Sequence, residues 1–176
     1  MDRSYQVTLT SQMFIVKELM RRLFLVYGVL FAIAETWLWH GKHLIVYGAA
    51  YFACFLIVEA IPSALFHLQY HRRDRGKVLC LDSAGRTMTV DQNGSSDTFK
   101  LSDLVKSGLI LDPFLYRGRK RGQASWGIYH YGRLHTNDGK IYIITCLLVN
   151  DLRKFFGDLG VEVTKVKRVY PIVRSK

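Results

Sequence analysis

The sequence has little of what most enzymes and disulfide-bonded proteins are built from. Its three cysteines are isolated, with no CxxC pair, so a disulfide framework and a structural zinc site are both disfavoured. It has no P-loop, no GxGxxG fingerprint and no GxSxG elbow near a suitable histidine and acid. The acidic residues of its polar part are scattered, several of them at turn or helix-cap positions. We therefore predict a protein that is not an enzyme and holds neither a metal nor a cofactor.

Acidic residues are also scarce. Against 14 aspartates and glutamates stand 25 lysines and arginines, giving a net charge of +11 and an isoelectric point of about 9.7. Such a surplus suits nucleic acid, an anionic membrane or an acidic partner, and composition alone does not choose among them. The hydrophobic fraction of 49% is ordinary, but it is concentrated between residues 23 and 68. The rest is typical of a water-soluble domain.

Two apolar runs, 23–39 and 44–68, follow one another with only a short connection between them. A membrane-spanning helix needs about 20 predominantly apolar residues, and a chain cannot turn inside lipid with its backbone unsatisfied. Both runs therefore predict spanning helices, joined as a transmembrane hairpin over 23–68; a buried soluble hairpin is the alternative. An N-terminal strand and an amphipathic lead-in are expected over 1–22, and a cytoplasmic domain over 77–176.

The positive charges around the hairpin predict its orientation. Three cations precede the first run and four follow the second, whereas the connection holds only Lys42. The excess of lysine and arginine on the cytoplasmic side of membrane proteins then places both termini in the cytoplasm. The flanking cations are Lys17, Arg21, Arg22, Arg72, Arg73, Arg75 and Lys77.

Two carboxylates, Glu35 and Glu59, lie within the apolar runs. Intramembrane acids are functional candidates by default. At about 1.5 Å per residue, the two side chains differ in depth by more than one helical turn, so they do not form a dyad. We favour an interfacial position or an ion pair, Glu59 with Arg21 or Arg22, over a proton relay. Pro62 predicts a kink near the end of the second helix or the point where the chain begins to leave it.

Two further patterns permit a ligand but have a simpler interpretation. His67 and His71 lie four residues apart, on one helical face, but no third ligand has a suitable spacing, so a metal site is not expected. Tyr129 and Tyr131, with Arg133 beyond them, share one strand face and have the chemistry to stack on bases. Cross-strand packing is the interpretation that we favour for these tyrosines.

Beyond residue 77 the hydrophobic pattern alternates with the period of β-strands. Asn93-Gly94 is a strong hairpin signal between two of these strands, and the spacing predicts a small antiparallel sandwich or barrel. The segment 150–160 predicts a helix with a cap at Asn150 or Asp151, an apolar stripe and an end at Gly160. Strands or extended segments are expected over 5–10, 77–82, 86–91, 97–101, 102–112, 126–136, 140–149 and 161–173.

This order of elements resembles a known family. "YQVTLT", the hairpin, "FKLSDLVKSGLI" and "HTNDGKIYIITCLLVNDLRKFF" together resemble small bacterial membrane proteins with a pleckstrin-homology-like domain, in particular the YcxB-like proteins. The resemblance spans nearly the whole chain, but no single residue is diagnostic. It implies a PH-like antiparallel β-barrel or sandwich, closed by a C-terminal helix and anchored in the bacterial inner membrane. It implies no catalytic residue.

The loop "YRGRKRG" at 116–122 concentrates positive charge between two predicted strands. Arg117, Arg119, Lys120 and Arg121 suit an anionic membrane surface or a lipid headgroup, where each cation contributes about 1 kcal/mol. A solvated loop is an equally simple interpretation, and a protein partner is a third. Nucleic acid is disfavoured because the run is short and isolated.

We therefore expect a non-enzymatic inner-membrane protein that presents a cytoplasmic PH-like binding or scaffolding module. Its expected partners are membrane lipids, a protein, or further copies of itself packed through the small residues of the hairpin. One alternative is an oligomeric transport or sensing component that uses Glu35 or Glu59. Another is an enzyme at the membrane surface, which requires an acid, a histidine and a cation to converge in one cleft.

Overall fold

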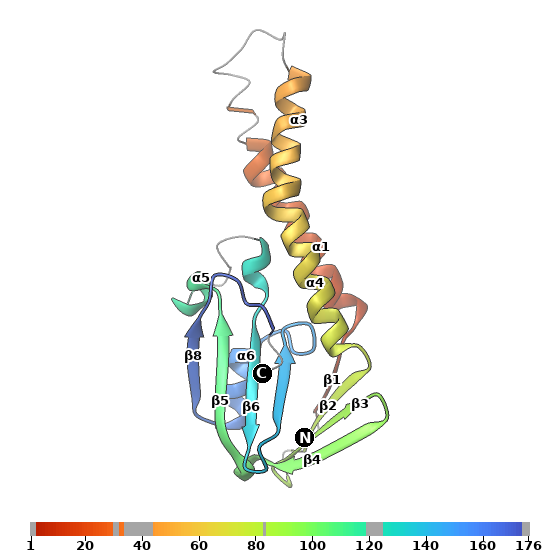
Figure 1. Ribbon diagram of the computed structural model, residues 1–176, viewed down its shortest axis with the longest axis vertical. Helices are drawn as coiled ribbons and strands as arrows, with labels where there is room; N and C mark the ends of the chain where they lie inside the picture. The colour runs from red at the N-terminus through yellow and green to blue at the C-terminus, as the bar shows by residue number, and fades with distance from the viewer. Residues whose placement is uncertain (1–2, 30–31, 34–43, 83, 119–124, 174–176) are drawn as a thin grey trace.

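The computed structural model describes residues 3–29, 32–33, 44–82, 84–118 and 125–173. Two helices extend from one end of a β domain, and both chain termini lie in or beside that domain (Figure 1). The domain contains two four-stranded sheets and a helix packed against them.

The first sheet has the order β1-β2-β3-β4 and is antiparallel throughout. β1 (Arg3–Gln6) forms its edge and pairs with β2 (Lys77–Asp82). An edge strand is therefore present near the N-terminus as expected, but it ends at Gln6 instead of reaching residue 10, because a helix begins at Leu9. β3 (Thr87–Gln92) and β4 (Ser95–Lys100) follow as a hairpin. Asn93 and Gly94 at its tip have φ angles of 53° and 82°, the left-handed values that a tight hairpin turn needs.

The second sheet has the order β7-β6-β5-β8. β5 (Leu104–Leu111), β6 (Tyr131–Thr136) and β7 (Ile141–Thr145) are antiparallel neighbours. β8 (Val163–Lys167) pairs with β5 in parallel, so the expectation of a wholly antiparallel domain is wrong for this pair. The reason is that a helix carries the chain from the end of β7 back to the end of the sheet where β5 begins.

That helix is α6 (Leu152–Leu159), which confirms the prediction for 150–160. The Asp151 carboxylate caps it by accepting a 3.0 Å hydrogen bond from the Lys154 N–H, and Gly160 ends it in a left-handed conformation with φ 65°. Its apolar stripe joins the core cluster that also contains residues from both sheets. The stripe consists of Leu152, Phe155, Phe156 and Leu159.

The two sheets form an open sandwich. Among the described residues no strand of one sheet pairs with a strand of the other, so the β-barrel alternative is wrong and the sandwich alternative holds. β4 and β7 are edge strands of the two sheets, and their side chains contact each other, as described below.

The two helices lie side by side above this sandwich. The first begins as α1 (Leu9–Arg22) and continues as the π-helical segment η1 (Leu23–Gly28). The second consists of α3 (Leu44–Phe55), the π-helical segment η2 (Leu56–Ala60) and α4 (Ile61–Asp74).

The helices contact each other through aromatic side chains. The rings of Tyr27 and Phe55 meet edge to face, with their centroids 5.0 Å apart. The second helix, over Val46–Asp74, is long and apolar enough to cross a membrane, and only 17% of its most apolar window is buried. The connection predicted at 40–43, and most of the first apolar run beyond Val29, lie outside the described residues.

Pro62 does not end the second helix, which continues for three further turns to Asp74. A proline within a helix removes one backbone donor and its ring clashes with the carbonyl four residues earlier. Here the turn before Pro62 is widened into η2, and such π-helical turns accommodate an interrupted hydrogen-bond ladder. The predicted local disturbance is therefore present, but the chain does not leave the helix there.

The lower end of α4 packs across the second sheet. Phe66 and Tyr70 form a buried cluster with residues from all three antiparallel strands of that sheet. The C-terminal segment covers the same place, because the Tyr70 hydroxyl donates a 2.7 Å hydrogen bond to the Pro171 carbonyl. The second sheet is thus covered on one face by α6 and the first sheet, and on the other by α4. The strand residues in the cluster are Ile110, Tyr131 and Ile143.

Two predicted strands are shorter than expected. Instead of beginning near 126, the segment before β6 forms the 3₁₀ helix η4 (Ser125–Ile128). Instead of continuing to 149, β7 ends at Thr145, whose carbonyl accepts from the N–H groups of Leu148 and Val149. Hydrogen bonds within these segments satisfy the backbone groups that a longer strand would have directed at a neighbour.

Candidate functional site

The basic loop begins at the end of the domain from which the helices extend (Figure 1). It follows β5 and the short helix α5 (Pro113–Tyr116), which is capped by a 2.8 Å hydrogen bond from the Phe114 N–H to the Asp112 carboxylate. Arg117, directly after α5, is exposed. Arg119, Lys120 and Arg121 lie outside the described residues, so their predicted contact with lipid headgroups stays a prediction.

Further cations reach this end of the domain through β8. Leu111 at the end of β5 pairs with Lys167, and the Arg168 N–H donates a 2.8 Å hydrogen bond to the Leu111 carbonyl. Lys167 and Arg168 are exposed, and β8 contacts α5. These two cations therefore lie at the same end of the domain as Arg117, although they are about fifty residues away in the sequence. Sequence reasoning missed them because nothing local shows which strand β8 joins.

Aromatic residues accompany these cations, of which Tyr116 and Tyr170 are exposed and Trp126 is half-buried. Trp126 on η4 stacks with Tyr170, at a centroid distance of 5.9 Å and an interplanar angle of 21°. Tyr170 is 55% exposed and Tyr116 is 44% exposed. Because η4 contacts α1, α4 and η2, this aromatic pair lies beside the two helices. We call Tyr116, Arg117, Trp126, Lys167, Arg168 and Tyr170 the helix-end surface.

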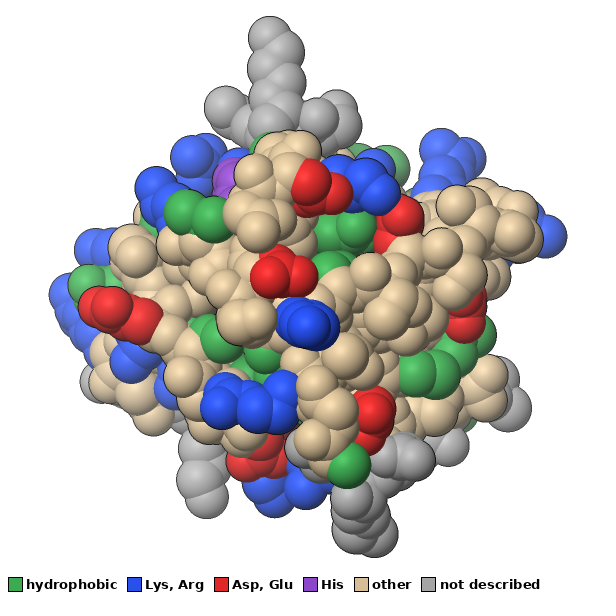
Figure 2. All heavy atoms as spheres, turned by 90° about the horizontal axis from the view of Figure 1, so that it is seen from below, with side chains coloured by type: hydrophobic (Ala, Val, Ile, Leu, Met, Phe, Trp, Pro, Cys, Tyr) green, Lys and Arg blue, Asp and Glu red, His purple; other side chains and the backbone are tan. Residues whose placement is uncertain are grey.

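The far end of the domain is different. Seen from below, its acidic and basic side chains are intermingled, and apolar side chains are scattered among them (Figure 2). An ion pair of 2.6 Å joins Arg3 to Asp158 in this part of the molecule, with both side chains partly exposed. At the helix-end surface, by contrast, the exposed rings of Tyr116 and Tyr170 lie together with cations.

The predicted intramembrane acids are only partly described. Glu59 is half-buried in η2, and Glu35 lies outside the described residues. Arg21, which we expected near Glu59, donates to Glu18 on its own helix, with a distance of 2.9 Å from Nε to Oε2. Glu18 is 7% exposed and was not singled out in the sequence. Its spacing of three residues from Arg21 was the available signal.

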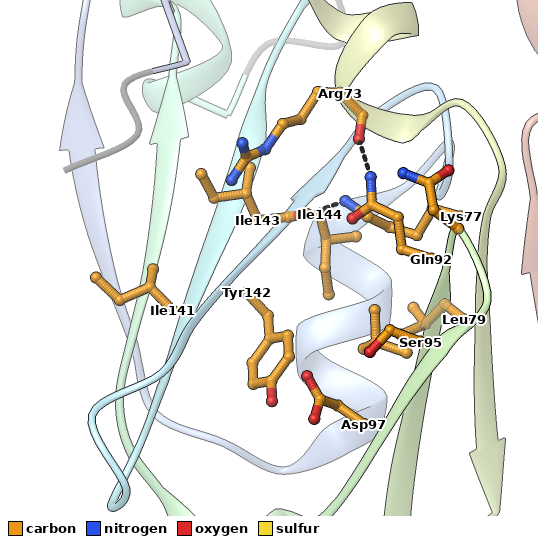
Figure 3. Close-up of a pocket in the computed structure, with 12 residues that line it drawn as sticks. Arg73, Lys77, Leu79, Gln92, Ser95, Asp97, Ile141, Tyr142, Ile143 and Ile144 are labelled. Carbon is orange, nitrogen blue, oxygen red and sulfur yellow. Dashed lines mark hydrogen bonds between the residues drawn. The ribbon is translucent and has the colours of Figure 1, made fainter.

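A second feature is a groove between the first sheet and β7, with a cavity volume of about 350 Å³ (Figure 3). Its buried lining includes Leu79 and Val90 from the first sheet and Ile144 from β7. Arg73, from the last turn of α4, extends toward Ile143 at one end of the groove (Figure 3). The groove therefore has buried apolar residues beneath a largely polar lining, with a cation at one end.

A buried polar cluster fixes α4 beside this groove. Lys77 Nζ lies 3.1 Å from Asp74 Oδ1 and 3.0 Å from the Ile143 carbonyl oxygen, and the Thr145 hydroxyl donates to the other oxygen of Asp74. Burial lowers the pKa of the Lys77 ammonium group, while the Asp74 charge opposes that shift. These contacts connect α4, β2 and β7, so both sheets are held to the same helix end.

The structure places the other residues considered in the sequence as follows. Tyr129 and Tyr131 are 0% and 1% exposed, which confirms that they are packing residues. Arg133 lies 5.6 Å from the centre of the Tyr131 ring. His67 and His71 stack with their ring centroids 6.1 Å apart. Within the described ranges, no group of three His, Cys, Asp or Glu side chains is placed to hold a metal ion.

Comparison with known proteins agrees with this architecture. The family model described as PH domain matches residues 4–155, from within β1 into α6. The chain belongs to the PH domain family. Neither the search of curated proteins nor the search of solved structures returned a match. PH domains are in general non-catalytic modules that bind lipids or proteins.

The family match also gives meaning to the position of the helices. It begins in β1 and continues through β2, so both helices lie within the matched range, in the connection between these two strands. Because β1 and β2 pair with each other, the helices are joined to the first sheet at both ends of this connection. The orientation of the PH domain relative to the helices therefore follows from the fold itself.

Proposed function

We propose that the protein is a non-enzymatic, membrane-anchored PH domain that binds or scaffolds other molecules at the cytoplasmic face of a bacterial inner membrane. The two helices serve as the anchor, and both termini lie in the cytoplasm. The YcxB-like membrane proteins are the subgroup that this proposal implies. Its expected ligands are anionic lipids, and its expected partners are proteins or further copies of the chain.

The helix-end surface is the observation that carries this proposal. Tryptophan and tyrosine favour the boundary between water and hydrocarbon because each ring has an apolar body and a polar edge. Cations beside them attract anionic headgroups with about 1 kcal/mol each. Because the surface lies at the end from which the apolar helices extend, insertion of the helices brings it to the headgroups. The anchor also raises the effective concentration of lipid, so weak contacts suffice.

The exposed apolar side chains of the second helix support the same arrangement. Val46, Phe52, Ile57, Ile61 and Leu65 are each more than half exposed. A soluble protein rarely leaves such a continuous apolar surface uncovered. Lipid is the environment in which this helix has no unfavourable contact with water.

The test uses the full chain in lipid nanodiscs, because the anchor and the domain share one sheet. Amide hydrogen exchange is measured for 113–118 and 165–170 in anionic and in zwitterionic lipid. We expect slower exchange of both segments in anionic lipid, and loss of this difference when Arg117, Lys167 and Arg168 are changed to glutamine.

The matched control changes Arg86, Lys100 and Lys106 to glutamine. These exposed cations lie before or near the start of β5, away from the helix-end surface, and their removal alters the net charge equally. The control variant should keep the response to anionic lipid. Equal exchange in both lipids for the unmodified chain would refute the headgroup contact.

A further inference from the structure

The groove next to β7 has an additional property, which lies in the backbone. β7 is an edge strand, and so is β4 on the other side of the groove. An edge strand presents unpaired N–H and C=O groups to any extended chain that approaches it. In the groove these groups have no strand partner within the described residues.

The hydrogen-bond pattern shows which backbone groups face the groove. Thr136 N–H donates to the Lys140 carbonyl and Cys146 N–H donates to the His130 carbonyl, so the even-numbered residues of β7 face β6. Antiparallel pairing alternates strictly along a strand. Ile141 and Ile143 therefore direct their backbone groups away from β6. The Lys77 ammonium group, 3.0 Å from the Ile143 carbonyl oxygen, agrees with this direction.

The groove has two different ends. Toward β4, the rings of Phe99 and Tyr142 stack with centroids 4.8 Å apart, and Lys140 forms a 2.7 Å ion pair with Asp97. These side chains hold the two edges together there. At the other end lies Arg73, which forms no ion pair within the described part of the chain, since Asp74 pairs with Lys77.

Lys77 limits the free backbone edge. It already occupies the Ile143 carbonyl, which leaves the N–H and C=O of Ile141 and the N–H of Ile143. Two donors and one acceptor are the groups that a short extended segment uses when it adds to a sheet. Beside them Ile141, whose side chain is 40% exposed and lines the groove, provides an apolar contact for a side chain of that segment.

We propose that the groove binds a short extended segment of a partner protein, which pairs with the edge of β7 and places a carboxylate on Arg73. The backbone edge selects an extended chain, and the exposed Ile141 favours an apolar side chain beside the pairing residues. Arg73 selects a negative charge at one end, because a carboxylate is the group that a guanidinium binds best among protein side chains. This binding is independent of any contact with lipid.

The experiment uses the full chain in detergent micelles and acetylated peptides that alternate threonine with valine. One peptide ends in glutamate with an amidated terminus, a second in glutamine with a free carboxylate, and a third in glutamine with an amide. The first peptide thus carries a side-chain carboxylate, the second a terminal carboxylate and the third none, so that the contribution of each kind of carboxylate can be measured. A fourth peptide repeats the better acid with methylated backbone nitrogens, which cannot donate to a sheet.

We expect the acidic peptides to slow amide exchange at Ile141 and Ile143, and the methylated peptide to have no such effect. Replacing Arg73 by glutamine should lower the affinity for the acidic peptides about tenfold, as expected for the loss of a charge-assisted hydrogen bond. The third peptide should be unaffected by that change. Arg72→Gln is the matched control, since Arg72 is an exposed neighbour that does not line the groove.

A second variant tests the backbone directly. Ile141→Pro removes the outward N–H and preserves the hydrogen bonds between β6 and β7, because proline is tolerated at such edge positions. This variant should weaken the binding of every peptide that pairs with β7 through its backbone. Unchanged exchange at Ile141 and Ile143 with all acidic peptides would overturn the proposal. So would equal binding of the methylated peptide, which indicates an apolar ligand, or protection that grows with protein concentration alone, which indicates a second copy.

Discussion

Lys77 and Asp74 form a 3.1 Å ion pair in which the side chains are only 5% and 0% exposed. The pair lies where α4 ends and β2 begins, and it is completed by Thr145 and the Ile143 carbonyl of the other sheet. Burying two charges costs free energy, but removing one of them leaves the other buried without its counter-ion, which costs more. This relationship explains how the anchor and both sheets are held at one point, and it leads to the first prediction.

Replacing Lys77 by methionine should lower the free energy of unfolding by roughly 3–5 kcal/mol, because Asp74 would stay buried without its cation. The double variant with Asp74→Asn should recover part of that loss. Lys140→Met is the control: its ion pair with Asp97 is about half exposed on both sides, and exposed pairs contribute about 1 kcal/mol or less. Denaturant unfolding of the full chain in detergent measures all three. Equal losses for Lys77→Met and Lys140→Met would contradict the prediction.

The packing of α6 on the second sheet depends on the absence of a side chain at Gly132. A Cβ atom at that position would collide with the ring of Phe156. Gly132→Ala should therefore destabilise the domain by about 1–3 kcal/mol through overpacking. Thermal unfolding measures the effect, and adding Phe156→Leu should restore part of the stability.

Gly157 supplies the comparison for this variant. It lies within α6, and a Cβ atom there would have no neighbour within 4 Å. Gly157→Ala should raise stability by about 0.5–1 kcal/mol, since alanine favours a helix over glycine. If both alanine variants changed stability in the same direction, the close contact between Gly132 and Phe156 would not explain the result.

Local signals in the sequence predicted much of this fold, and pairing between distant segments accounts for the rest. The hairpin turn at Asn93 and the helix capped by Asp151 depend on neighbouring residues, so they were predictable. The direction of β8 depends on where α6 delivers the chain, and no local pattern encodes that. The same holds for the groove, because its floor and Arg73 come from three separate parts of the chain.

The candidate site was predicted to a smaller extent for the same reason. Arg117 was found as part of a charged run, whereas Lys167 and Arg168 joined it only through the pairing of β8 with β5. Trp126 gave no signal because an isolated tryptophan is as common in cores as at membrane boundaries. Its partner Tyr170 reaches it from a segment that follows β8.

The pH dependence of stability should contain a contribution from His130. Burial is the main cause that lowers the pKa of its imidazole, and Arg153 adds to the shift. The Ile128 carbonyl oxygen, 2.8 Å from Nδ1, opposes it. The folded-state pKa is thus below that of the unfolded chain, so the unfolded state binds more protons between the two values. Stability should be complete above about pH 6.5 and should fall as the pH decreases below it.

Thermal unfolding of the full chain between pH 5 and pH 8 checks this dependence. His130→Gln should flatten the curve below pH 6.5, because the titrating group is gone. His135→Gln on β6 is the control and should leave the slope in place. A slope unchanged by His130→Gln would show that other groups cause the acid sensitivity.

The attachment of the C-terminal segment to α4 can be tested through Tyr70. The side chain of Tyr70 is fully buried, and its hydroxyl donates a hydrogen bond to the Pro171 carbonyl. The neighbouring residue of α4, Gln69, donates a side-chain hydrogen bond to the Val173 carbonyl. Tyr70→Phe should cost about 1 kcal/mol and leave the Pro171 carbonyl without its donor. Amide exchange of Ile172 and Val173 should then become faster, whereas the control Tyr116→Phe, at a site 44% exposed, should leave it unchanged.

Because the same segment carries Tyr170, loosening it should also weaken the response of the helix-end surface to anionic lipid in nanodiscs. Faster exchange without any change in that response would show that Trp126 and the cations act without Tyr170.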